Sequence, residues 1–205
     1  MNKYFKLTLL IVPFIVACSN NKTSTSESSS SKINSNSSSI VSDSSSSASS
    51  LEETYTLEYS FENNNSAVQI STGNHINLLK EMLKIDSGDV SDVSVNEKVY
   101  FDQGGLKFGS SKAEGEMIVT FNKKISKVEV EASCFYSEYN KLYDEAKILL
   151  NDTPYEVKTG EDHSFATLDN LTNTNDLKIA NEIIEGSSTA SNRLIVHRLK
   201  VWLIK

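Results

Sequence analysis

The stretch RLIVHRLKVWL, residues 193–203, shows the alternation of apolar and polar side chains that is typical of a β-strand. The leucine and valine just before His197 share one parity, whereas the leucines and valine after Arg198 share the other. One extra residue here, a β-bulge at His197 and Arg198, would return every later side chain to the first face. We therefore expect a long bulged strand in which Trp202 points away from the apolar set, either under a neighbouring loop or exposed.

The chain from residue 98 onward reads as nearly continuous antiparallel β-structure. Besides the last strand, strands are expected at residues 99–101, 106–109, 115–121, 127–136, 147–150, 155–158, 164–168 and 176–180. The turn sequence NDTP at residues 151–154 joins two of these strands as a hairpin. Many short strands at roughly 8–12-residue spacing predict a β-sandwich or barrel.

The part before residue 98 mixes strand and helix patterns. Residues 53–61 alternate, with three aromatic side chains and a leucine on one face, and residues 67–71 form a second short strand. Residues 74–85 switch to a helical period, with Asn74 as the N-cap. The apolar stripe of this helix is expected to pack on the core, the alternative being a surface for a partner helix.

An acidic segment, DSGDVSD, follows at residues 86–92. Calcium takes several carboxylate and carbonyl oxygens, so this segment is one candidate for a cation site. However, Asp86, Asp89 and Asp92 recur at every third position, which is not the spacing of an EF-hand. The favoured interpretation is a solvated turn.

The N-terminal residues 1–17 have the pattern of a secretory signal. Lys3 and Lys6 precede a short apolar run that is about half the length needed to span a bilayer. The run ends in IVAC, residues 15–18, which resembles a bacterial lipobox. The resemblance implies diacylglyceryl attachment to the Cys18 sulfur, cleavage before Cys18, and a lipid-anchored protein on the extracellular face of the cell membrane. The alternative is an ordinary signal peptide with a chance cysteine.

Residues 18–50 form a low-complexity linker in which more than half of the residues are serine. Such a segment cannot bury enough apolar surface to offset its chain entropy, so we expect it to be disordered. Residues 51–205 then remain as a single folded domain.

The net charge argues against one class of partner, and the number of cysteines argues against a disulfide. The formal net charge of −7 makes nucleic acid an unexpected partner, because that binding needs clustered lysine and arginine. With Cys18 assigned to lipid, Cys134 has no disulfide partner and is expected to be a buried thiol.

Five segments of the chain together carry a family resemblance. They are GGLKFGSSK at 104–112, GEMIVTF at 115–121, VEVEA at 128–132, the hairpin at Asn151 and the NRL start of the last strand. They resemble a jelly-roll-like β-sandwich module at the C-terminus of secreted or lipid-anchored proteins of low-GC Gram-positive bacteria, which can follow extracellular nucleases of the endonuclease I type. The likeness covers residues 99–205. It implies an accessory or binding module with no assigned ligand and no transferable functional residues.

This chain departs from the module pattern in two ways. Residues 137–146 are a longer, tyrosine-rich connection, and no catalytic nuclease segment precedes the module. Together the patterns predict a mainly β fold: an antiparallel jelly-roll-like β-sandwich with one short helix, preceded by a signal peptide and a disordered linker.

The sequence contains no recognisable catalytic, metal-binding or cofactor motif. His75, His163 and His197 share no metal-ligand spacing, and neither HExxH, GxSxG nor a phosphate-binding loop occurs. His197 on the bulge is a candidate site residue, but a hydrogen-bonded histidine on an edge strand is the favoured interpretation. We expect no enzyme activity, metal or cofactor.

The candidate binding residues are aromatic: Tyr136, Tyr139, Tyr143 and Trp202. Tyrosine offers a large apolar face and a polar tip, which suits stacking on sugars or contact with a protein. The alternative is that two of the three tyrosines tuck into the rim of the sandwich.

The leading hypothesis is a surface lipoprotein that displays a non-catalytic binding or adhesion module for a glycan or a protein. Two other functions remain open. One is a hydrolase with a carboxylate site that the sequence does not reveal. The other is a structural subunit of an envelope complex.

Overall fold

The computed structural model describes residues 52–63, 67–110, 112–171, 173–184 and 192–205. These residues belong to one compact unit, Ala48–Lys205. The predicted signal peptide, the lipid site at Cys18 and the linker at 18–50 lie outside the described residues. Within the described residues, no helix has the length and apolar character needed to cross a bilayer.

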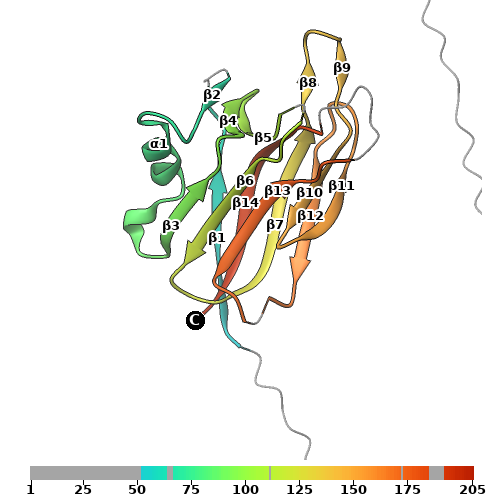
Figure 1. Ribbon diagram of the computed structural model, residues 1–205. Coiled ribbons are helices and arrows are strands. Elements are labelled where there is room, and N and C mark those ends of the chain that lie inside the picture. Colours follow the sequence, from blue (N-terminus) through green and yellow to red (C-terminus); the bar gives the residue numbers. More distant parts are fainter. Residues whose placement is uncertain (1–51, 64–66, 111, 172, 185–191) are drawn as a thin grey trace, which may run out of the picture. The chain divides into compact units, whose positions relative to one another are not determined.

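The fold is mainly β and antiparallel, as predicted (Figure 1). In chain order the elements are β1 Thr54–Ser60, β2 Val68–Gln69, α1 His75–Met82, the 3-10 turn η1 Ile85–Ser87, β3 Val90–Val95, β4 Val99–Asp102, β5 Gly105–Phe108, β6 Glu116–Phe121, β7 Ile125–Cys134, β8 Tyr136–Ser137, β9 Leu142–Tyr143, β10 Ala146–Leu150, β11 Thr153–Val157, β12 Ser164–Asp169, β13 Asp176–Asn181 and β14 Leu194–Ile204.

Two sheets form the body of the domain. The larger has the strand order β12-β7-β14-β5-β4-β2, with β1 also paired to β14, and the smaller has the order β11-β10-β13-β6-β3. Alternate side chains of both sheets join one hydrophobic core, for example Val130 and Leu199 from the larger and Met117 and Ile179 from the smaller. This is the β-sandwich that the strand spacing predicts.

The bulge predicted in the last strand is confirmed. Val196 pairs with Ala132 and Arg198 pairs with Glu131, so His197 is the extra residue. Leucine and valine side chains on both sides of it are fully buried in the core. The edge-strand interpretation of His197 is wrong, because β14 lies inside the sheet, with β7 along one side and β5 and β1 in succession along the other.

The other predicted strands are also present, with small differences at their ends. The β10–β11 hairpin turns at Asn151 and Asp152, which have φ of 46° and 65°. Two consecutive residues with positive φ suit a tight two-residue hairpin turn. The expected strand at 127–136 is wrong at its end, because β7 stops at Cys134 and the chain then forms the small β8–β9 hairpin.

The predicted helix is α1, and its apolar stripe packs on the core as expected. Leu79 and Leu83 are fully buried. Asn74 is the N-cap residue, but its side chain makes no capping hydrogen bond.

The acidic turn expected at 86–92 is only partly correct, because Val90 begins strand β3. A register shift between Val90 and Asp92 leaves Ser91 and Asp92 both exposed. Because of this irregularity, apolar and polar residues do not alternate regularly at the start of β3, so the sequence pattern does not indicate a strand there. Across the described part of the chain, no three histidine, cysteine, aspartate or glutamate side chains are grouped as metal ligands.

Cys134 is a buried free thiol, as predicted. Its Sγ lies 3.7 Å from the backbone oxygen of Val157. Burial, opposed by a backbone hydrogen bond from Ala146, raises the pKa of this thiol to about 11.

Candidate binding site

A cavity of about 540 Å³ opens where β14 begins, beside the β8–β9 hairpin. Its lining combines aromatic, amide and charged side chains: Asn63, Asp102, Gln103, Gly104, Phe135, Tyr136, Ser137, Glu138, Tyr139 and Arg193. A concave surface with a few fixed polar groups among apolar ones is the usual form of a ligand site. Two of the four predicted aromatic residues, Tyr136 and Tyr139, line it.

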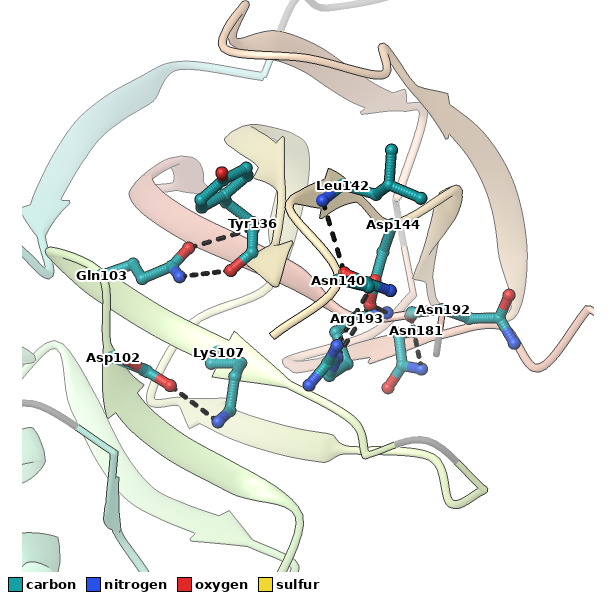
Figure 2. A network of polar contacts seen from close by, with 10 residues as sticks. All are labelled: Asp102, Gln103, Lys107, Tyr136, Asn140, Leu142, Asp144, Asn181, Asn192 and Arg193. Carbon is teal, nitrogen blue, oxygen red and sulfur yellow. Dashed lines mark hydrogen bonds and ion pairs between the residues drawn. The ribbon is translucent and has the colours of Figure 1, made fainter. Parts of the chain in front are cut away.

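Arg193 is held in place by a buried carboxylate (Figure 2). Its Nε donates to Oδ2 of Asp144 at 2.8 Å, and its backbone N–H donates to the same oxygen at 3.2 Å. The guanidinium also lies 4.1 Å from the ring centre of Phe135. Because only 3% of the Asp144 side chain is exposed, this pair fixes a planar donor group at the edge of the cavity.

A second ion pair lies on the neighbouring β4–β5 hairpin. Nζ of Lys107 donates to Oδ2 of Asp102 at 2.7 Å, and each side chain is only 12% exposed. The same ammonium lies 4.4 Å from the ring centre of Tyr100 and 5.1 Å from that of Phe135. The positive charge therefore sits between a carboxylate and two aromatic rings, which holds Asp102 in one position at the cavity wall.

Gln103 ties the β4–β5 turn to the β8–β9 hairpin (Figure 2). Its Nε2 donates to the backbone oxygen of Tyr136 at 2.6 Å, and the backbone N–H of Tyr136 donates to Oε1 of Gln103 at 3.1 Å. The side-chain amide thus satisfies both backbone groups of one residue, as a neighbouring strand would. This contact positions the hairpin over the cavity.

The three tyrosines of the hairpin have different environments. Tyr136 and Tyr143 contact each other, with ring centres 4.9 Å apart and planes tilted by 51°. Tyr143 packs partly against the core, and desolvation together with the Glu161 carboxylate raises its pKa. Tyr139 is 99% exposed at the turn of the hairpin. Only Tyr143 therefore packs against the core, while Tyr136 and Tyr139 are among the residues that line the cavity.

Trp202 lies elsewhere on the molecule. It is half-buried on β14, with the ammonium groups of Lys127 and Lys200 at 5.0 Å and 5.1 Å from its ring. It points away from the core, as expected, but paired strands rather than a loop surround it. Arg193 and Trp202 are nine residues apart, so about 30 Å of strand separates them.

His197 is hydrogen-bonded to Ser133 and to the backbone of Gly104, and it does not line the cavity. Its Nε2 lies 2.8 Å from Oγ of Ser133, and its ring stacks on His163 at 4.2 Å with planes 5° apart. His163 in turn places Nδ1 2.5 Å from Oε1 of Glu131. Burial and the neighbouring His163 lower the pKa of His197, although the Glu131 carboxylate opposes this.

Several residues of this site were not predicted, including Asp102, Gln103 and Arg193. Arg193 and its partner Asp144 are 49 positions apart, and Gln103 and Tyr136 are 33 apart. No spacing motif links residues that far apart. The one signal in the sequence was the tyrosine-rich connection itself.

Comparison with known proteins finds no matching family model and no matching curated protein. Among solved structures, a secreted serine protease, VesC from Vibrio cholerae, aligns with a TM-score of 0.41 and 17% identity over 60% of this chain and 26% of that chain. A family two carbohydrate esterase from Cellvibrio japonicus aligns with a TM-score of 0.38 and 12% identity over 74% of this chain and 34% of that chain. A carbohydrate-binding module, CBM36, in complex with calcium and xylotriose aligns with a TM-score of 0.32 and 12% identity over 54% of this chain and 87% of that chain. Similarity at this level assigns no function to this chain.

Proposed function

We propose that the cavity beside the β8–β9 hairpin binds a carbohydrate. The observation that carries this proposal is the presence of Tyr136 and Tyr139 in the lining next to polar groups that are already held in place. Sugars present flat C–H faces and a rim of hydroxyl groups. Exposed rings can cover the faces, while carboxylate, amide and guanidinium groups can bond to the hydroxyls.

The fixed geometry of the polar groups supports binding. Asp144 orients Arg193, Lys107 orients Asp102, and Gln103 is held by the Tyr136 backbone. Side chains that are ordered before the ligand arrives lose little conformational entropy on binding. Tyr139, which is almost fully exposed, would gain the most burial from a ligand.

We further propose that this site binds without catalysis. Asp102, which lines the cavity, and Asp144, behind it, are both paired with cations, which leaves Glu138 as the one lining carboxylate outside these two ion pairs. A glycosidase needs two carboxyl groups that flank the scissile bond, one of them able to donate a proton. An assay for reducing ends released from any glycan that binds tests this, and release that is lost on Asp102→Asn would overturn it.

The pairing of β1 with β14 shows where the chain enters the domain. Thr54, the first residue of β1, pairs with Ile204 at the end of β14, whereas Arg193 precedes the start of β14. The chain therefore enters the domain at the end of β14 remote from the cavity. If Cys18 carries the lipid, as the lipobox resemblance implies, the predicted linker at residues 18–50 connects the domain to the membrane. Metabolic labelling with a palmitate analogue tests the anchor, because Cys18→Ala must abolish the label.

The binding test is a screen of the compact unit, residues 48–205, on an array of neutral and acidic glycans. Saturable binding that is lost in Tyr139→Ala is the expected result. Leu142→Ala is the matched control, because Leu142 is 57% exposed on the same hairpin but does not line the cavity. A blank array with folded protein, or equal loss in both variants, would overturn the proposal. A single protein recovered by pull-down from envelope extracts would instead support the structural-subunit hypothesis.

A further inference from the structure

A second, smaller depression of about 100 Å³ lies on the larger sheet. It is lined by side chains from four strands: Glu58, Glu129, Glu131, Phe165, Arg198 and Lys200. These residues alternate with core residues along each strand, as Val130 lies between Glu129 and Glu131. The depression is therefore on the face of the larger sheet that points away from the core.

The two depressions lie along the same strands, a few residues apart. On β7, Glu131 lines the smaller depression, and Phe135, just past the end of the strand, lines the cavity. On the other side, Arg198 of the smaller depression lies 3.6 Å from Glu62, which precedes Asn63 of the cavity lining. A ligand that leaves the cavity along the strands thus meets the smaller depression next.

The stacked histidine pair contacts residues of both, because His197 is hydrogen-bonded to the backbone of Gly104, which lines the cavity. His163 is stacked on His197 at 4.2 Å, and its side chain remains 42% exposed. Glu131, which lines the smaller depression, holds His163 through the contact with Nδ1. A flat ring surface therefore continues the path between the two depressions.

Phe165 provides an exposed aromatic ring in the smaller depression. It is 65% exposed on β12, directly opposite Glu131 on β7. A large apolar side chain left in water on a strand gains free energy when a ligand covers it. Together with Tyr139 in the cavity lining, it gives each depression one exposed aromatic ring.

The charges along the smaller depression are mixed. Its three glutamates face two cations, Arg198 and Lys200, and Arg198 lies 3.6 Å from Glu131. Such a surface offers both hydrogen-bond donors and acceptors without a strong field of one sign. This suits a neutral polyhydroxylated ligand better than an anionic one.

From these contacts we propose that the site binds a linear, neutral oligosaccharide that extends from the cavity into the smaller depression, with Phe165 as a second stacking platform. This inference rests on the proposed carbohydrate binding at the cavity. Arg193, just before β14, and Lys200, within it, are seven residues apart, so the path is on the order of 20 Å long. Only a chain of several sugar residues covers that length.

Titration calorimetry with four β-1,4-linked series tests the inference: xylo-, cello-, manno- and galacto-oligosaccharides of two to six residues. The expected result is that one series binds more tightly as the chain lengthens. Phe165→Ala then weakens the longest member by about tenfold and leaves the two-residue member unchanged. Tyr139→Ala weakens every member. Phe165→Tyr, which keeps the ring, retains long-chain binding.

The control is Ile183→Ala, because Ile183 is an exposed large apolar residue that lines neither depression. It is expected to bind all chain lengths as the unaltered protein does. Affinity that does not change with chain length, or an equal effect of Phe165→Ala on short and long chains, overturns the extended path while leaving the cavity proposal in place. Absence of binding by all four series, when another glycan on the array binds, overturns the extended neutral path alone, and only a blank array overturns the cavity proposal as well.

Discussion

Arg193 and Asp144 form a buried ion pair across 49 residues of sequence, with Nε donating to Oδ2 at 2.8 Å. The pair joins the start of β14 to the segment just after β9. Because the Asp144 side chain is 3% exposed, almost none of its charge is solvated by water. Stability of the domain and geometry of the cavity therefore depend on the same contact (Figure 2).

Asp144→Asn is expected to lower the free energy of unfolding by about 2–4 kcal/mol, because it leaves the Arg193 guanidinium without its counter-charge. Urea unfolding followed by Trp202 fluorescence measures this. The matched control is Glu156→Gln, which breaks an exposed pair with Lys147 and should cost less than about 1 kcal/mol. Equal effects of the two substitutions would contradict the role given to Asp144.

Gly109→Ala is expected to destabilise the domain by about 2–4 kcal/mol for two reasons. Gly109 has a φ of +87°, and an added Cβ would lie 2.6 Å from Nδ2 of Asn181. That amide is fully buried, accepts from the N–H of Gly115 and donates to the oxygen of Asn192. Thermal unfolding measures the effect.

The control for this glycine is Gly88→Ala, where φ is +91° but nothing lies within 4 Å of the added Cβ. Only backbone strain is expected there, about 1 kcal/mol. If Gly88→Ala lowered the stability as much as Gly109→Ala, the contact with Asn181 would not contribute to the effect.

Stability should fall as the pH drops below about 6.5, in part because of His197. Burial lowers the pKa of this ring in the folded protein, so the unfolded chain takes up a proton at a higher pH than the folded one. Below the usual pKa the unfolded state therefore binds more protons, and acid favours it. His197→Gln removes this contribution, so its free energy of unfolding should change less between about pH 7.5 and 5.5. If the free energy of unfolding changed equally between these two pH values with and without His197→Gln, His197 would not be the cause. His75→Gln serves as the histidine control.

Gln103→Ala should loosen the β8–β9 hairpin with little effect on overall stability. The substitution removes both hydrogen bonds to the Tyr136 backbone, which is partly exposed, so the cost is about 1 kcal/mol or less. Hydrogen exchange at the Tyr136 amide should become faster, because local opening no longer breaks a bond to Oε1. Gln69→Ala, which removes an exposed side-chain contact with Ser71, should leave that exchange unchanged.

The position of the bulge in β14 shows how far local patterns reach. The alternation of apolar and polar residues shifts by one position at His197, because the apolar side chains on both sides of it must face the same core. The structure has its extra residue at this position. The sequence pattern did not predict strand β3, because this strand is short and has a register shift of its own. The shift leaves Ser91 and Asp92 both exposed, so its residues do not alternate with a period of two.

The sequence by itself determined the class of the fold, most of its strands, the single helix expected at 74–85 and the burial of Cys134, because each depends on residues close together along the chain. Tertiary structure alone decided which strands are neighbours, and therefore that Arg193 meets Asp144, that Gln103 holds Tyr136, and that Trp202 lies far from the tyrosines. Strand order is set by packing summed over the whole core, and no short stretch of residues encodes it.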